Sequence, residues 1–359
     1  MLGHDTSVIT STVIPSYVGN LNKDFGDDPK DVKVIRLKPK FTLGQIVIAR
    51  GIKREINKLN PDLVIVIGLG KAFPKPVFST KFATVTLLGD NAHSYANLSF
   101  KTKILFSLFK KSTYRKAIRR SANLIAYTPQ SFEAAAKMMG GKDAEILRNQ
   151  TDYISLGFWG DEFYFSSLLR TAKRAELGYN DEDNVIITAT RVVPEKNLEA
   201  VIPLLAETPF NVKWLIVGSA GDDYAKELND YLQTFIGKNR VRILGYADKH
   251  HLNALYNAAD MALYTVPAIS IFEAIGTGLR LIAGEDKSLQ HLRNTEYFFS
   301  SYRGVSTELY GWGYVENEPE EVRMQRSTKA KAAFGWEKIA GDILNIADKS
   351  ILSKSRQNP

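Results

Sequence analysis

The fold of this chain is indicated by two segments, Thr188-Ala-Thr-Arg-Val-Val-Pro-Glu-Lys-Asn-Leu and Ser270-Ile-Phe-Glu-Ala-Ile-Gly-Thr-Gly-Leu. The first places Arg191 and Lys196 after an apolar strand and at the mouth of a helix, and the second places Glu273 in the first turn of another helix. Cations beside helix N-termini form a seat for a diphosphate, and a carboxylate accepts hydrogen bonds from sugar or ribose hydroxyls. Together the segments predict a nucleotide-sugar site.

Outside these segments, short apolar runs alternate with helical patterns in two successive series. Short apolar runs of this kind are typical of buried parallel strands. The first series predicts strands at Val32–Leu37, Leu63–Gly68, Ala83–Leu88 and Leu124–Tyr127, with helices at Gly44–Leu59 and Ser131–Met139. A loop-like region, Ser155–Asp183, precedes the second series. That series predicts strands at Val185–Ala189, Val212–Val217, Val241–Leu244, Met261–Tyr264 and Leu279–Ala283, with helices at 195–206, 222–236, 248–258 and 271–277.

Two such series predict an α/β chain of two doubly wound, Rossmann-like domains, with ligands at the carboxyl ends of the strands and a central cleft between the domains. The length of 359 residues and the 44% hydrophobic content suffice for two cores. The chain has no cysteine, so disulfides and thiolate metal sites are excluded, and a reducing compartment is favoured. No run reaches the roughly 18 apolar residues that a membrane-spanning helix needs.

The net charge is +8, and part of it is concentrated in the segment 101–120. This segment contains no acidic residue and eight basic ones: Lys101, Lys103, Lys110, Lys111, Arg115, Lys116, Arg119 and Arg120. Apolar residues interrupt them, among them Ile104, Leu105 and Phe109. A basic helix of this kind either binds an anionic bilayer or packs its apolar side chains into its own domain while its lysines are solvated. No nucleic-acid motif is present, so we expect no nucleic-acid partner.

An ordered series of motifs in the second half resembles the retaining glycosyltransferases of family 4, which have the two-domain GT-B fold. The series begins with Ser155-Leu-Gly-Phe-Trp-Gly-Asp-Glu-Phe and the Arg191 segment, and continues with Leu215-Ile-Val-Gly-Ser-Ala-Gly, whose Gly218 would contact the nucleotide sugar. It ends with Leu244-Gly-Tyr-Ala-Asp, the Glu273 segment and Phe334-Gly-Trp-Glu-Lys-Ile-Ala. The resemblance implies an acceptor-side domain over 1–155, completed by a C-terminal helix at about 336–352, and a nucleotide-sugar-binding domain over 156–335.

The resemblance also implies roles for individual residues. Arg191 and Lys196 would neutralise the donor diphosphate and stabilise the leaving nucleotide. Alternatively, each cation pairs with Glu195 or Glu199. Glu273 would bind the ribose, whereas the spacing Ser270-x-x-Glu273 also fits a capping box that occupies the carboxylate. Backbone N–H groups at Ile269 and Ser270 would bind phosphate or sugar oxygens.

Three positions depart from the family pattern. Thr265 stands where the family has a first glutamate, and Gly89 stands where it has a histidine, which leaves Asp90 and His93 as the polar candidates of that loop. The third departure is at the start, because Gly3-His-Asp-Thr-Ser-Val-Ile-Thr resembles the second strand of the family's first domain. We therefore expect the N-terminal domain to lack its first strand and helix.

These observations predict a retaining glycosyltransferase that moves a sugar from a UDP- or GDP-sugar to a glycan or a lipid-linked acceptor, with no metal and no tightly bound cofactor. The predicted location is the cytoplasm, with peripheral contact to the membrane face through 101–120. Two other classes stay open, namely a non-catalytic homologue that binds a nucleotide sugar or a partner enzyme, and a nucleotide-sugar epimerase.

Overall fold

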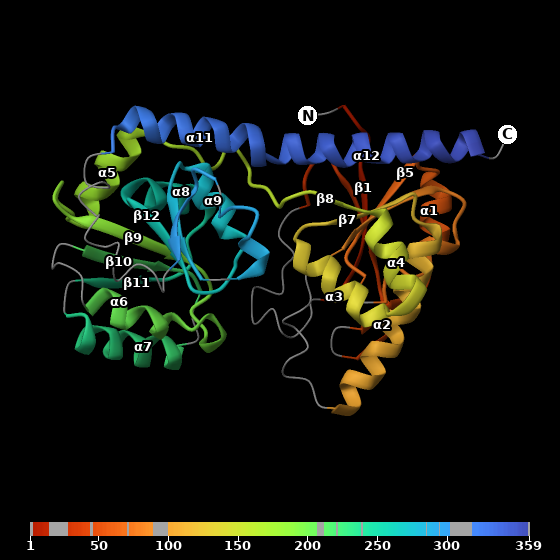
Figure 1. Cartoon of the computed structure of the whole chain (residues 1–359), viewed down its shortest axis with the longest axis horizontal. Coiled ribbons are helices and arrows are strands. Elements are labelled where there is room, and N and C mark those ends of the chain that lie inside the picture. Colours follow the sequence, from red (N-terminus) through yellow and green to blue (C-terminus); the bar gives the residue numbers. More distant parts are fainter. Residues whose placement is uncertain are drawn as a thin grey trace. The chain divides into compact units, whose positions relative to one another are not determined.

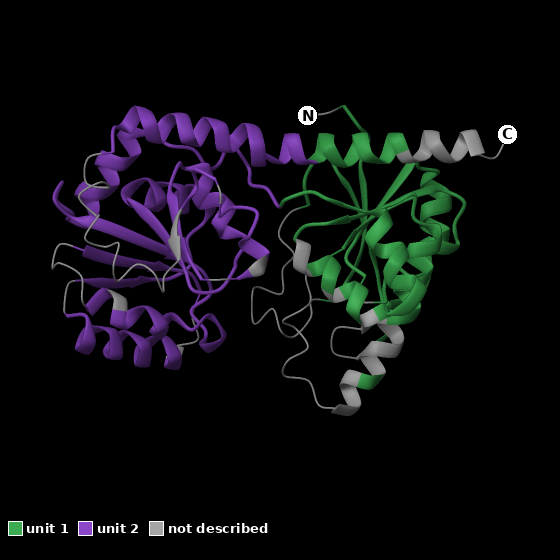
Figure 2. Cartoon of the chain, in the orientation of Figure 1, with its two compact units in different colours: residues 1–155, 340–359 green, residues 156–339 purple. Residues whose placement is uncertain are grey.

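The structure is a computed structural model, and it describes residues 3–13, 28–43, 46–69, 72–88, 100–206, 212–219, 222–237, 240–284, 286–293, 295–301 and 318–357. The chain divides into two compact units (Figure 2). Unit 1 comprises Met1–Ser155 and Ala340–Pro359, and unit 2 comprises Leu156–Ile339. The last helix, α12 (Trp336–Gln357), begins in unit 2 and continues into unit 1.

Unit 2 is built on one six-stranded parallel sheet with the order β11-β10-β9-β12-β13-β14. Its strands are β9 (Asn184–Ala189), β10 (Val212–Val217), β11 (Val241–Leu244), β12 (Met261–Tyr264), β13 (Arg280–Ala283) and β14 (Phe298–Ser301). The chain runs outward from β9 to β11 and then returns to add β12 on the other side of β9. The strand order therefore reverses between β9 and β12, which is where such sheets bind ligands at the strands' carboxyl ends.

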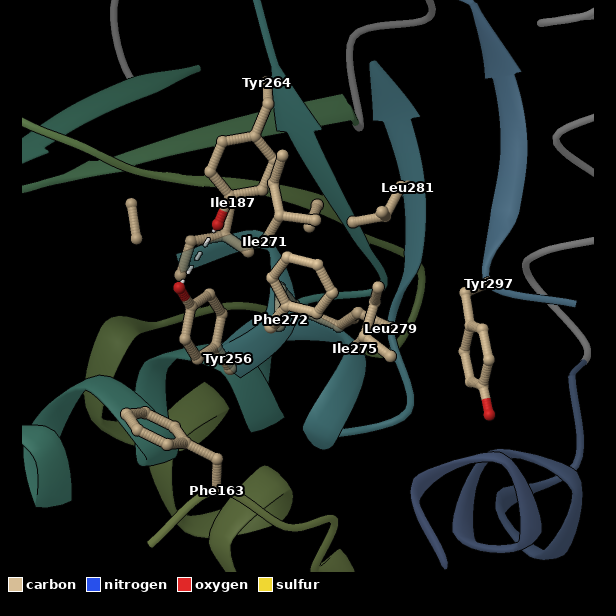
Figure 3. Packing of buried hydrophobic residues seen from close by; sticks show 14 of the residues in the cluster. Phe163, Ile187, Tyr256, Tyr264, Ile271, Phe272, Ile275, Leu279, Leu281 and Tyr297 are labelled. Carbon is tan, nitrogen blue, oxygen red and sulfur yellow. Dashed lines mark hydrogen bonds between the residues drawn. The ribbon is translucent and has the colours of Figure 1, made fainter. Parts of the chain in front are cut away.

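Helices cover both faces of this sheet (Figure 1). On one face α6 (Ile202–Ala206) and α7 (Asp222–Phe235) pack around the buried Trp214. On the other face lie α8 (Lys249–Ala258), α9 (Ser270–Gly276) and α11 (Glu320–Phe334). Figure 3 shows the second core, in which Phe163, Tyr256, Tyr264 and Phe272 pack together. Strands β9 and β12 are buried on both faces, and their sequences are for this reason largely continuous apolar runs.

Unit 1 has its parallel strands in two separate sheets. One pairs β1 (Ser7–Ser11) with β2 (Lys33–Leu37), and the other has the order β5-β6-β7-β8. The strands of the second sheet are β5 (Leu63–Ile67), β6 (Ala83–Leu88), β7 (Asn123–Ala126) and β8 (Thr151–Tyr153). Ile9 of β1 and Val64 of β5 pack against the same core, yet among the described residues no strand pairs with the second edge of β1 or of β5.

Four helices of unit 1 contribute to this core, and an antiparallel hairpin precedes the first of them. The helices are α1 (Ile52–Leu59), α2 (Phe100–Arg120), α3 (Pro129–Met139) and α4 (Gly141–Gln150). The hairpin consists of β3 (Pro39–Leu43) and β4 (Ile46–Ala49). The predicted fold class, an α/β chain of two Rossmann-like domains, is confirmed.

Of the helix predicted at 195–206, only Ile202–Ala206 is α-helical, because Pro194–Lys196 and Leu198–Val201 are 3-10 turns. Two further sequence-based assignments are wrong in part. The helix predicted over Gly44–Leu59 begins at Ile52, while Ile46–Ala49 is a strand. The β-branched residues there alternate in burial, with Val47 buried and Ile48 exposed, and Gly51 has a φ of 96°, which separates the strand from the helix.

The second error concerns the loop-like region Ser155–Asp183, which contains helix α5 (Ser167–Leu177). Besides its leucines, this helix uses arginines to contact the residue that precedes β12. Arg170 and Arg174 both form ion pairs with Asp260, at N–O distances of 2.5 and 3.3 Å. The sequence pattern could not show these pairs, since the partner lies far along the chain.

Candidate donor site at the carboxyl edge of the unit 2 sheet

The loop that carries Arg191 and Lys196 follows β9 and lies against the end of β10. Thr190 N–H donates to the Val217 carbonyl (2.8 Å), and Val192 N–H donates to Ser219 (2.9 Å). Gly218 permits this close approach, because a Cβ there would lie 1.8 Å from the Thr190 carbonyl oxygen, and its φ is 152°. The structure thus gives Gly218 a role in positioning the loop, while its predicted contact with the ligand stays a prediction.

Neither cation of this loop forms an ion pair among the described residues. Glu199, one of the two alternative partners, instead accepts a hydrogen bond from the Tyr224 hydroxyl (2.5 Å). Arg191 is exposed and Lys196 is half-buried. Burial, and then the charge of Arg191, lower the pKa of Lys196. Two neighbouring cations that repel each other and lack a carboxylate partner favour an anion between them.

The segment after β12 is attached to the β9 loop by two side-chain hydrogen bonds. The Ser270 hydroxyl donates to the Ala189 carbonyl (2.6 Å), and the Thr265 hydroxyl donates to the Lys196 carbonyl (2.5 Å). The Tyr256 and Tyr264 hydroxyls both donate to the Ser270 carbonyl, at 3.1 and 3.0 Å. Figure 3 shows these tyrosines inside the core. The start of α9 is therefore held from the sheet and from the core.

These bonds show that the capping-box alternative is wrong. No side chain caps α9, and the Ser270 hydroxyl is directed to β9 instead of to Glu273. Glu273 is half-buried, and its carboxylate has no hydrogen-bond partner among the described residues. Burial raises the pKa of Glu273, and the charge of Lys249 opposes this rise. A half-buried carboxylate without a hydrogen-bond partner is an available acceptor for ligand hydroxyls.

Sequence reasoning did not single out Lys249, the first residue of α8. Its ammonium lies 5.4 Å from the centre of the Trp159 ring and 3.8 Å from a Glu162 oxygen, and its charge acts on Glu273. Its position just after the Gly245-Tyr-Ala-Asp motif was the available signal. Ile269, another predicted contact, is 61% exposed at the start of α9.

The predicted residues of unit 2 thus gather where the strand order reverses, at the ends of β9 and β12. The remaining two candidates, Asp90 and His93, lie outside the described residues, as does Gly89. Within the described part of the chain, no three His, Asp or Glu side chains are grouped as metal ligands. No helix there has the length and apolar character needed to span a bilayer.

Residues 170–292 match the family model described as "Glycosyl transferases group 1". The matched segment contains Arg191, Lys196, Thr265 and Glu273. A search of curated proteins gives no match to this chain.

Solved structures support the fold over nearly the whole chain. HepE from Anabaena, crystallised with UDP and also with UDP-glucose, is 19% identical, with a TM-score of 0.66 for the UDP complex over 90% of this chain and 86% of that one. Sucrose-phosphate synthase from Thermosynechococcus elongatus is 17% identical, with a TM-score of 0.71 over 98% and 90%. WaaG, a glycosyltransferase of lipopolysaccharide biosynthesis, is 15% identical, with a TM-score of 0.62 over 97% and 90%. At these identities the likeness establishes the GT-B-type fold.

Proposed function

We propose that this chain is a retaining glycosyltransferase that binds a nucleotide-diphosphate sugar at the carboxyl edge of the unit 2 sheet. One observation carries the proposal: two cations without carboxylate partners, Arg191 and Lys196, follow β9 where the strand order reverses. Glu273, in the first turn of the helix that follows β12, also lacks a hydrogen-bond partner among the described residues. The match of residues 170–292 to group 1 glycosyl transferases supports it. The UDP and UDP-glucose complexes of HepE support a UDP-sugar as donor.

In this proposal the two cations stabilise the negative charge of the leaving group. When the bond between the anomeric carbon and the diphosphate oxygen breaks, negative charge grows on the leaving nucleotide. Arg191 and Lys196, already fixed by the loop after β9, stabilise that charge without reorganising. Glu273 accepts hydrogen bonds from the ribose hydroxyls and orients the nucleotide. The sugar passes to a hydroxyl or phosphate of the acceptor, and the basic segment 101–120 favours a membrane-associated acceptor such as a lipid-linked saccharide.

Thermal shift with UDP, GDP, ADP and their sugar conjugates tests the donor site. We expect one nucleotide class to raise the melting temperature, since a ligand that binds the folded state stabilises it. The Arg191→Ala/Lys196→Ala variant should lose this rise, whereas Lys226→Ala/Lys142→Ala, which removes the same charge from exposed positions, should keep it. An equal rise in both variants would show that the diphosphate binds elsewhere.

A second candidate, a nucleotide-sugar-binding homologue without transferase activity, is favoured by Thr265. Its hydroxyl donates to the Lys196 carbonyl, so it fixes the loop and supplies no negative charge. Release of nucleotide diphosphate from the preferred donor separates the candidates. If a folded protein binds the donor yet releases none with a broad set of acceptors, the homologue explains the site better.

Contact with an anionic bilayer through 101–120 belongs to the same proposal. Helix α2 buries Tyr114 and Ile118 in unit 1 while Lys116 and Arg120 are exposed, and Ile104 near its start is 49% exposed. Cations near an anionic surface each contribute about 1 kcal/mol. Flotation with anionic vesicles should recover the protein, and charge reversal at Lys101, Lys103, Lys110 and Lys111 should abolish recovery. Equal flotation of the two proteins would leave the helix as a solvated face.

A further inference from the structure

Unit 1 contains a polar cavity at the edge of its sheet opposite to the strands' carboxyl ends. The cavity has a volume of about 400 Å³ and lies where α2 and α4 end and where β7 and β8 begin. This volume is within the ~300–1,000 Å³ that is usual for small-molecule sites. The candidate donor residues belong to unit 2 and the lining residues to unit 1, so the two sites share no residue.

The lining combines hydrogen-bond donors and acceptors that the fold leaves available. Arg119, Asn149 and Gln150 are exposed in the lining, and none of them has a side-chain partner among the described residues. Asp152 accepts one bond from the Asn123 amide (2.6 Å) and keeps further acceptor capacity. Planar amide, carboxylate and guanidinium groups of this kind bind vicinal hydroxyls through paired hydrogen bonds.

The hydroxyl group of Thr151 is a buried polar group of this cavity that lacks a hydrogen-bond partner among the described residues. A buried hydroxyl without a partner costs free energy, so a water molecule or a ligand hydroxyl would satisfy it in this cavity.

The charges around the cavity restrict the class of that molecule. Asp152 and the carbonyl ends of α2 and α4 oppose an anion, since a helix C-terminus carries partial negative charge. Arg119 opposes a cation. A neutral molecule with several hydroxyl groups satisfies both the donors and the acceptors of the lining.

We propose that this cavity binds a neutral sugar residue. This inference rests on the proposed glycosyltransferase function. The bound sugar is then a residue of the acceptor glycan other than the one that receives the transferred sugar. Unit 1 would then hold the acceptor by a second sugar contact, so that longer glycans bind more tightly than short ones.

Saturation-transfer NMR on the full chain tests the proposal with methyl glycosides of glucose, galactose, mannose and N-acetylglucosamine, and with glucuronate and glucosamine as charged counterparts. The protein carries Arg191→Ala/Lys196→Ala, which removes signal from the donor site. We expect at least one neutral glycoside to bind and the charged sugars to bind more weakly. Asn149→Leu/Gln150→Leu should raise the Kd about tenfold or more, as expected for the loss of two hydrogen bonds.

Thr151→Val separates a binding role from a structural one. If the hydroxyl only helps to fold unit 1, the variant loses stability and keeps its sugar affinity. If the hydroxyl contacts the ligand, melting temperature is kept or raised and sugar binding weakens. Lys142→Ala, in the first turn of α4, is the control that should change neither.

Absence of signal from every glycoside, or one Kd shared by all variants, would overturn the proposal. The thermal shift with nucleotides is an independent readout, so a protein that binds UDP and no glycoside contradicts the cavity alone.

Discussion

The two units use the same parallel α/β design, yet their sheets differ in continuity. In unit 2 six strands form one sheet, and Ile186, Ile187 and Leu263 in its central strands are fully buried. In unit 1 the parallel strands are divided into two sheets, and Ile65 and Ile67 of β5 are 42% and 74% exposed. A continuous buried sheet fixes the loops at its carboxyl edge, whereas an open strand edge leaves unpaired backbone groups. Unit 2 therefore presents the loops after β9 and β12 from one continuous sheet.

The four tryptophans permit this comparison to be measured. Trp159, Trp214, Trp312 and Trp336 all belong to unit 2, so their fluorescence follows the unfolding of that unit. Far-UV circular dichroism follows both units. Denaturant curves recorded by the two probes therefore separate an effect on unit 2 from an effect on unit 1.

The largest expected effect is from Arg323→Ala in α11. The fully buried guanidinium donates to the carbonyls of Tyr256, Ala259 and Thr277, at the ends of α8 and α9. Truncation leaves these carbonyls without a charged donor, so the free energy of unfolding should fall by roughly 3–5 kcal/mol. Urea titration followed by tryptophan fluorescence measures it. Lys329→Ala on the same helix is the exposed control, and an equal loss there would refute the account.

Gly218→Ala should have the next largest effect. A Cβ would meet the Thr190 carbonyl at 1.8 Å, so the loop of Arg191 and Lys196 must move, at a cost of about 2 kcal/mol or more. Nucleotide stabilisation in thermal shift should be lost. Gly245→Ala is the matched control, since no atom lies within 4 Å of its Cβ position. Full nucleotide binding by Gly218→Ala would show that the loop is not fixed by this contact.

Glu273→Gln should weaken nucleotide binding about tenfold and slightly stabilise the free protein at neutral pH. Burial raises the pKa of Glu273 in the folded state, so between the unfolded and the folded pKa the native state holds more protons. Stability contributed by the protonated form is then lost as pH rises through that window. The variant should not show this loss. Its melting temperature, measured between pH 4 and 8, should therefore change less with pH than that of the unaltered protein. A steeper profile would exclude a buried, unpaired carboxylate.

The smallest effect is expected from Ile67→Thr on the exposed edge of β5. With 74% of its surface in solvent, this side chain contributes little burial, so the change should stay within about 0.5 kcal/mol. Circular dichroism during urea unfolding measures it. Ile187→Thr in β9, which is fully buried, is the counterpart in unit 2 and should cost several times more. Equal costs would remove the distinction between the sheets.

Five strands of unit 2, β9 to β13, were predicted to within a residue because buried parallel strands are largely continuous apolar runs, whereas the edge strand β14 was missed. The residues that follow them were predictable for the same reason, since Arg191, Thr265 and Glu273 come after the ends of β9 and β12. Helix α5 and strand β4 were missed or assigned wrongly. Helix α5 contacts Asp260, which lies far along the chain, through an ion pair of Arg170. Strand β4 forms because it pairs with β3 in a hairpin.

By itself the sequence determined the alternation of strands and helices, the two-domain class and the types of residue at the candidate site. Only the tertiary structure decided what those residues do locally. Ser270 has the spacing of a cap, yet it donates to Ala189, 81 residues away, and this leaves the Glu273 carboxylate available. Lys249 next to Glu273 and the unpartnered Thr151 in its cavity are likewise products of packing. The physical reason is that local patterns report which groups a segment carries, while hydrogen-bond partners are set by segments that only folding brings together.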